Sequence, residues 1–135
     1  MWALREQDMV SAEEVLARFV LQSRHLRQDQ TVRPDAFIPH PWPDLSVTRH
    51  LKLNEAAIWD IGRDVAKQIG KTLYCRADVN AGVVLKLQLR VLAAPTEKNP
   101  NHANVVDWPV ERSAQKILAQ EISAAAGKAK IPPAG

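Results

Sequence analysis

The clearest pattern in the chain is a run of alternating apolar and polar residues near its middle. Every second residue of this run is apolar, at Leu85, Leu87, Leu89 and Val91. That spacing is typical of a β-strand with one buried face. It predicts a strand over Val83–Leu92, joined through a tight connection at 80–82 to a strand over Thr72–Val79. An alternative stays open, in which Asn80 caps a short helix that continues through Leu87.

Helical spacing is most distinct after Asn54. The apolar residues of this stretch share one stripe, at Ile58, Ile61, Val65 and Ile69. Asn54 is a favourable N-cap, and Gly70 stands where helices commonly end in the left-handed conformation. The sequence therefore predicts a helix from Glu55 to Ile69. Before it, Leu45–His50 alternates with period two and predicts a strand.

The segment 12–23 fits two structures. Ser11 followed three residues later by Glu14 has the form of a capping box, and apolar residues continue at helical spacing. These apolar residues are Val15, Leu16, Phe19 and Val20. We therefore predict a helix from Ala12 to Ser23. The same run is rich in strand formers, so a β-strand is the alternative.

Two loops and a last helix complete the predicted organisation. The stretch 28–44 holds Pro34, Pro39, Pro41 and Pro43. Prolines remove amide donors and restrict the preceding residue, so we expect an extended loop without helix or strand. The residues expected to hold this loop to the body are Phe37, Ile38 and Trp42. A polar loop is predicted at 95–104, a short edge strand at Val105–Trp108 and a helix over Val110–Ala125.

The last helix is expected to bury one face. That face holds Ala114, Ile117, Leu118, Glu121, Ile122 and Ala125. Together the elements predict an α+β fold, with a small mainly antiparallel sheet of three to five strands packed against two or three helices. A chain of 135 residues has the size of one domain. We predict a single compact domain over 1–135, with less ordered termini at 1–10 and 127–135.

Composition narrows the class of protein. Hydrophobic residues make up 46% and charged residues 24%, which is typical of a globular domain. The longest apolar runs, Ala56–Trp59 and Val91–Ala94, are far shorter than the roughly 20 residues that span a bilayer. The start of the chain also lacks the apolar stretch of a signal peptide, so we expect a cytoplasmic protein without membrane contact. Cys75, the single cysteine, is expected to be buried on a strand.

Positive charge is concentrated in one part of the chain. The formal net charge is only +3, which is weak support for a nucleic-acid partner. Between residues 18 and 33, however, the only acid is Asp29. The basic residues of this stretch are Arg18, Arg24, His25, Arg27 and Arg33. They form either a phosphate-binding surface or a solvated face whose arginine stems lie along apolar surface.

Common catalytic and cofactor motifs are not found in the sequence. The histidines His25, His40, His50 and His102 are too widely spaced for a short metal-ligand motif. The sequence has no GxSxG, GxGxxG or GxxxxGK[ST] motif. We therefore predict neither a metal nor a cofactor.

Candidate site residues stand at strand ends and on loops, where binding sites are usually built. The ligand-binding candidates are Arg49, Arg76, Asp78, Asn101, His102 and Asn104. Two arginines that converge would hold carboxylate or phosphate oxygens, and His50 or His102 would then be the catalytic candidate. The alternative is structural, with Arg76 paired to Asp78 and His102 ordering its loop.

Two functional hypotheses follow. The first is a small binding or interaction module that recognises a protein partner or an acidic small ligand through polar loops and a basic face. The second is a small transferase or hydrolase that acts on a phosphorylated or nucleotide-like substrate. A cleft shared by Arg49, Arg76 and His102 would favour the enzyme. Edge strands near Val105 or Leu45 would be compatible with a homodimer.

Overall fold

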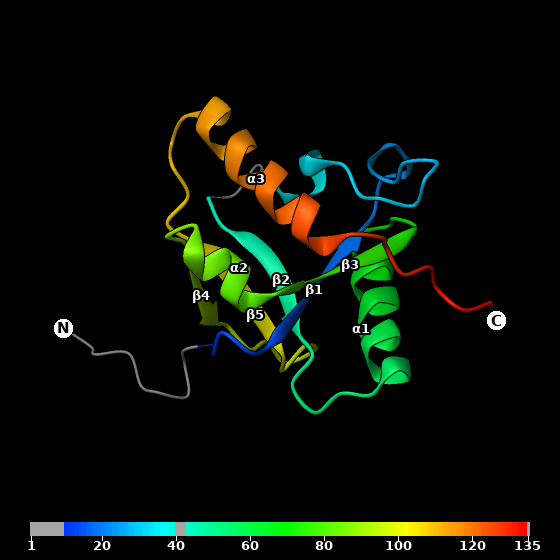
Figure 1. The fold of residues 1–135 in the computed structure, drawn as a ribbon. Coiled ribbons are helices and arrows are strands. Elements are labelled where there is room, and N and C mark those ends of the chain that lie inside the picture. The colour runs from blue at the N-terminus through cyan, green and yellow to red at the C-terminus, as the bar shows by residue number, and fades with distance from the viewer. Residues whose placement is uncertain (1–9, 40–42, 135) are drawn as a thin grey trace.

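Within residues 10–39 and 43–134, which the computed structural model describes, five strands form one sheet and three α-helices pack against it (Figure 1). The strands are β1 Val15–Val20, β2 Leu45–Arg49, β3 Cys75–Asn80, β4 Arg90–Ala93 and β5 His102–Val106. The helices are α1 Glu55–Gln68, α2 Ala81–Lys86 and α3 Arg112–Ala126, with 3₁₀ turns η2 Ser23–His25 and η3 Pro34–Phe37. The α+β prediction is confirmed.

The sheet is antiparallel throughout, in the order β3-β1-β2-β5-β4. Its side chains alternate between two covered faces. Leu16 and Val47 lie in the larger core, which α3 and η3 help to enclose. Ala17 and Phe19 point to the opposite face and pack with Ile58 of α1. Figure 1 shows α1 beside β3, well separated from α2.

The predicted helix over Ala12–Ser23 is wrong, because this segment forms β1. Adjacent Leu16 and Ala17 are both fully buried, in different cores, which an extended backbone between two layers allows. The local contact behind the prediction still exists, since the Ser11 amide donates to the Glu14 carboxylate at 3.0 Å. It closes a turn before the strand.

The predicted hairpin at 72–92 is also wrong, and the alternative helix is correct. Residues Ala81–Lys86 form α2, and the Asn80 side chain accepts a hydrogen bond from the Gly82 amide at 2.9 Å. The first predicted strand of the pair survives as β3, whereas the second is reduced to Arg90–Ala93. The reason is topological: β3 and β4 lie at opposite edges and run parallel, so a tight turn cannot join them.

The predicted edge strand after the polar loop is an interior strand. β5 begins at His102 and pairs with both β2 and β4, so Val105 and Leu45 are not at an edge. The sheet edges are β3 and β4. On β3, backbone hydrogen bonds of 3.0 and 2.9 Å join Arg76 to Lys130 of the C-terminal segment. The expectation that Val105 and Leu45 lie on edge strands is therefore wrong.

Helix α1 begins where predicted and ends one residue before the predicted end at Ile69. The Asn54 side chain accepts from the Ala57 amide at 2.8 Å, and Gly70 adopts a φ of 65°. The buried residues are Ile58, Trp59, Gly62 and Ala66. Ile69, expected on the buried stripe, is 58% exposed because it follows the last turn of the helix.

Helix α3 forms near its predicted position but presents a different face. Its buried residues are Ala119, Ile122 and Ser123, whereas Ile117 is 62% exposed. Alanines occur on several faces of this helix, so the sequence alone did not identify which face is buried. Val110, the predicted first residue, precedes the helix and is exposed.

The proline-rich segment contains one short helical turn, contrary to prediction. Pro34 begins η3, where its missing amide costs no hydrogen bond. Phe37 is buried and Ile38 packs against the same core, as expected. Trp42 lies outside the described residues. Cys75 is buried on β3, as predicted.

A split between β1 and β2 shapes the centre of the sheet. β1 pairs with β3 along all six of its residues, but with β2 only at Leu16↔Arg49 and Ala17↔Thr48. Beyond this point Arg18 spans the gap, donating from Nη1 to the Ser46 carbonyl at 2.9 Å and from Nε to the Ala36 carbonyl at 2.8 Å. The Arg18 side chain thus joins β1, β2 and η3.

No helix within the described part of the chain has the length and hydropathy that a bilayer crossing requires.

Close packing of α1 on the sheet gives a first prediction. A Cβ atom at Gly62 would lie 2.6 Å from Cε1 of Phe19. Gly62→Leu should therefore lower the free energy of unfolding by about 2 kcal/mol or more through overpacking. The exposed Gln68→Leu in the same helix should change it by less than about 0.5 kcal/mol. Urea denaturation measures both, and equal stability of the two variants would contradict this packing.

Candidate functional site

The candidate arginine Arg49 is neutralised by a carboxylate. Its guanidinium forms two bonds to Glu14, with Nε–Oε1 at 2.7 Å and Nη2–Oε2 at 2.9 Å. Burial alone would raise the pKa of Glu14, but the hydrogen bond from Arg49 and its charge hold that pKa below the usual value. Such a bidentate pair fixes the turn before β1 to the end of β2.

Arg76 is the most deeply buried charged side chain among the described residues. It donates from Nε to Asp78 Oδ1 at 3.0 Å and from Nη2 to Glu55 Oε2 at 2.5 Å. Its guanidinium carbon lies 4.8 Å from the centre of the Trp59 ring, and Nη1 has no hydrogen-bond partner there. The aromatic face offsets part of the cost of burying this cation. The structural alternative, an Arg76–Asp78 pair, is what the geometry shows.

His50 belongs to the same cluster. Its Nε2 lies 3.1 Å from Asp78 Oδ1, so one carboxylate joins His50 to Arg76. Burial would raise the pKa of Asp78, but hydrogen bonds from His50 and Arg76 lower it overall. Lys130 extends the cluster, with Nζ 3.6 Å from Glu55 Oε1. We call these five residues, His50, Glu55, Arg76, Asp78 and Lys130, the buried ion cluster after its centre, Arg76; Glu55 and Lys130 lie at its exposed margin.

The candidate residues of the later loop support its shape. Asn101 Nδ2 donates to the Arg49 carbonyl at 2.9 Å, and His102 Nδ1 contacts the Ala94 carbonyl at 2.9 Å. Asn104 is half-buried on β5. Buried Asn99, which is not among the site residues predicted from the sequence, donates to Thr48 Oγ1 at 3.0 Å. These contacts tie the loop to β2.

The candidates do not meet in one cavity among the described residues. His102 lines a pocket of about 150 Å³ whose lining includes neither Arg49 nor Arg76. The shared cleft that would favour an enzyme is therefore not observed within residues 10–39 and 43–134. His50 has a carboxylate partner, but no described hydroxyl or thiol is hydrogen-bonded to it.

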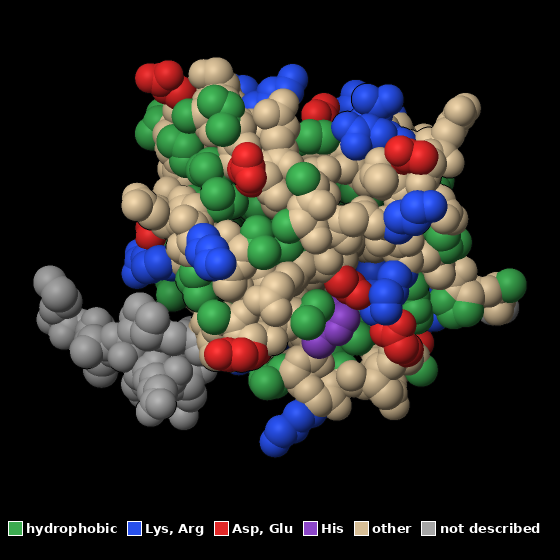
Figure 2. Space-filling view, in the orientation of Figure 1, with side chains coloured by type: hydrophobic (Ala, Val, Ile, Leu, Met, Phe, Trp, Pro, Cys, Tyr) green, Lys and Arg blue, Asp and Glu red, His purple; other side chains and the backbone are tan. Residues whose placement is uncertain are grey.

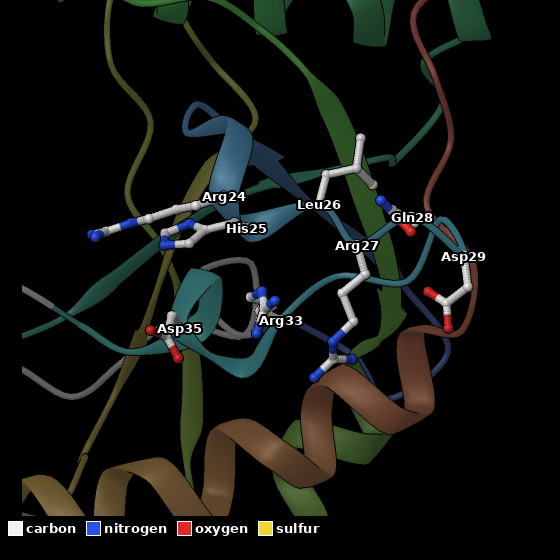
Figure 3. A pocket seen from close by; sticks show the side chains of 8 residues that line it. All are labelled: Arg24, His25, Leu26, Arg27, Gln28, Asp29, Arg33 and Asp35. Atoms are coloured by element: carbon white, nitrogen blue, oxygen red, sulfur yellow. The ribbon is translucent and has the colours of Figure 1, made fainter.

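A different part of the molecule brings together cations that have no ion-pair partner among the described residues. Residues 24–35 enclose an open hollow of about 750 Å³ (Figure 3). Its lining side chains are Arg24, His25, Leu26, Arg27, Gln28, Asp29, Arg33 and Asp35. Figure 3 shows Arg33 near the middle, Arg27 on one side of it, and His25 with Asp35 on the other. We call this site the basic hollow.

The arginines of the basic hollow have no carboxylate partner among the described residues. Within residues 10–39 and 43–134, the cations that form ion pairs are Arg49, His50, Arg63, Arg76, Arg90 and Lys130, none of which lines the basic hollow. Of the two acids in the lining, Asp29 is engaged within the turn, accepting from the Thr31 amide at 3.0 Å and hydroxyl at 2.6 Å. Asp35 is the second acid in the lining, and it forms no ion pair with the described residues. The guanidinium groups of Arg24, Arg27 and Arg33 are thus free of ion pairs within the described chain.

Burial and the positive charge of the hollow both affect the pKa of His25. Its pKa is lowered below the usual histidine value, first by burial and then by the charge of Arg24, with smaller contributions from Arg18 and Arg33. Asp35 acts in the opposite direction but does not reverse the shift. His25 is therefore favoured in its neutral form at neutral pH.

The segment that carries these arginines is held at several points. Leu26 pairs with Val32 across a turn, and the Arg33 amide donates to the His25 carbonyl at 2.8 Å. Val32 is buried, and its carbonyl accepts a hydrogen bond from the Ser123 hydroxyl of α3. The basic hollow is thus built on a fixed backbone, which lowers the entropic cost of binding.

The sequence identified this cluster but not its geometry. The scarcity of acids between residues 18 and 33 was the available signal. The turn at 27–31 was also marked locally, because Asp29 followed two residues later by Thr31 can form an Asx turn. The separate position of Arg18, in the split of the sheet, depends on strand pairing that no local pattern reveals.

Comparison with protein families, with characterised proteins and with solved structures finds no match to this chain.

The buried ion cluster gives a second prediction. Asp78→Asn removes the carboxylate shared by Arg76 and His50, so the free energy of unfolding should fall by about 3 kcal/mol. Asp60→Asn, which removes an exposed carboxylate 3.7 Å from Arg63, should cost less than about 0.5 kcal/mol. Denaturant unfolding at neutral pH measures both variants. Similar losses in the two would contradict a structural role for the cluster.

Asp78→Asn also tests how the free energy of unfolding depends on pH. Because the pKa of Asp78 is lowered by folding, its stabilisation is present above the unfolded-state value and is lost as pH falls through the folded value. Wild-type stability should therefore decline more steeply below about pH 4 than that of Asp78→Asn. Parallel declines would contradict the lowered pKa.

Proposed function

We propose that this protein is a noncatalytic binding module that holds a phosphate-bearing ligand in the basic hollow. The observation that carries the proposal is that Arg24, Arg27 and Arg33 line the same open hollow and have no carboxylate partner in the described chain. Figure 3 shows Arg27 beside Arg33, whereas Arg24 extends away from them on the side of His25. A guanidinium matches phosphate oxygens with two parallel N–H donors. Three such groups favour a ligand with more than one negative charge.

The contrast with the other arginines supports this assignment. Arg49, Arg76 and Arg90 each contact a carboxylate at 3.0 Å or less, so their guanidinium groups already have anionic partners within the fold. Placing three guanidinium groups around one hollow without such partners is unfavourable for the free protein. A bound polyanion removes that repulsion.

The size and openness of the hollow also fit a multiply charged ligand. A volume of about 750 Å³ lies within the range of small-molecule sites. The side chains around it are largely polar or charged, with Leu26 as the apolar exception. Affinity would therefore come from charge-assisted hydrogen bonds, and would weaken as salt screens the charges.

The test is calorimetric titration with sodium tripolyphosphate at low salt. Arg24→Ser/Arg27→Ser/Arg33→Ser should weaken binding at least tenfold, since each lost charge-assisted hydrogen bond contributes about 1.5 kcal/mol or more. The matched control is Lys98→Ser/Arg112→Ser/Lys116→Ser, which removes the same charge from exposed positions elsewhere. The control should bind as wild type does.

Two results would contradict the proposal. One is no binding of tripolyphosphate to the wild type at low salt. The other is equal weakening in both triple variants, which would indicate an unspecific charge effect. Single-stranded RNA is the second probe: binding that requires the same three arginines and weakens steeply with salt would identify the phosphate-bearing ligand as a nucleic acid.

A further inference from the structure

The split between β1 and β2 contains a second, smaller pocket, distinct from the basic hollow. It has a volume of about 150 Å³, and its lining includes neither Arg24, Arg27 nor Arg33. The lining side chains are Arg18, Phe19, Leu21, Ser46, Val47, Thr48, Val65, Asn99 and His102. The residues come from β1 and the residue after it, from β2 and α1, from the loop before β5 and from the first residue of β5.

Arg18 gives this pocket an uncompensated positive charge. Its bonds to the Ser46 and Ala36 carbonyls use two of five guanidinium N–H donors, and both partners are neutral. No carboxylate within the described chain pairs with it, and burial alone lowers the pKa of Arg18 to about 10. A half-buried cation without a counter-ion is costly, and an anion in the pocket would offset that cost.

The walls of the pocket are apolar. Phe19 and Leu21 contribute from β1 and the residue after it, and Val65 contributes from α1. A cavity of about 150 Å³ with apolar walls can hold a body the size of benzene. A ligand that filled the pocket would therefore combine a compact apolar body with one anionic group.

The lining also includes His102, whose ring can supply a hydrogen-bond acceptor. A carbonyl oxygen only accepts, so His102 Nδ1 must donate to Ala94, which leaves Nε2 of the neutral ring as an acceptor. His102 pairs with Thr48, two residues along β2 from Ser46, which is roughly 7 Å at the rise of a strand. That spacing corresponds to the length of a benzene ring with a substituent at each end.

From these contacts we infer that the pocket between β1, β2 and α1 binds a small aromatic carboxylate, with its carboxylate at Arg18 and a hydroxyl at His102. The carboxylate accepts from the unused guanidinium N–H groups, the ring packs on Phe19 and Val65, and the hydroxyl donates to His102 Nε2. The inference does not depend on the basic hollow.

The probe is 4-hydroxybenzoate, titrated into ¹⁵N-labelled protein and followed by NMR. Amide shifts should concentrate at residues 18–21, 46–48 and 65, with a dissociation constant of about 1 mM or lower. The uncharged 4-hydroxybenzamide should bind at least tenfold more weakly, because it lacks the charge that Arg18 requires.

Two variants locate the site. Val65→Trp should fill the pocket and abolish the shifts, whereas Gln68→Trp, at an exposed position of the same helix, should leave them unchanged. Arg18→Met should also abolish binding, but it removes contacts that hold β2 and η3. Val65→Trp, which keeps Arg18, is therefore the decisive variant if Arg18→Met fails to fold.

Three results would overturn the inference. The first is equal affinity for 4-hydroxybenzoate and 4-hydroxybenzamide. The second is unchanged binding in Val65→Trp. The third is shifts confined to residues 24–35, which would assign the carboxylate to the basic hollow and leave the pocket in the split without a ligand.

Discussion

The hydrogen bonds of Arg18 across the split between β1 and β2 are the interaction on which the arrangement of this protein depends. β1 is fully paired with β3 but shares only two paired positions with β2. Without Arg18, the Ser46 and Ala36 carbonyls would lose the donor that each now has from β1. The same side chain that joins the strands also brings a positive charge into the sheet.

The split also determines where the basic hollow lies. After β1 the chain leaves the sheet, forms η2 and the turn at 27–31, and returns through η3 to the Arg18 guanidinium. The turn is fixed to α3 by the bond between Ser123 and Val32. Basic side chains in this excursion therefore project from a backbone that the core holds in place.

Charged residues divide into two groups with different roles. In the buried ion cluster, carboxylates bind Arg76 and His50, so the charges stabilise the fold and are not available to a ligand. In the basic hollow, the arginines lack such partners within the described chain. Figure 2 shows that over the visible face, by contrast, acidic and basic side chains are interspersed.

The sequence predicted the elements whose signals are local. Asn54 and Gly70 marked the ends of α1, and period-two alternation marked β2. The errors arose where distant contacts decide: β1 is a strand because two cores bury it from opposite sides, and α2 replaces a hairpin because β3 and β4 lie at opposite edges.

The same distinction applies to the candidate site. Arg49 could not be excluded from the sequence, because its partner Glu14 stands 35 residues away. The Arg76–Asp78 pair was foreseen as an alternative, since the two residues share one face of a strand. The basic cluster was visible as a run of arginines, whereas the pocket beside Arg18 depends on the β1–β2 register.

The most direct test of the account is the pKa of the His25 imidazole, followed by NMR at low salt. Burial and the charge of Arg24 together predict a pKa below that of a solvent-exposed histidine, and the contribution of charge predicts a rise in this pKa when tripolyphosphate is added or Arg24 is replaced by serine. A His25 pKa at the usual value that responds to neither change would show that the hollow carries no free positive charge, and would contradict the proposed function.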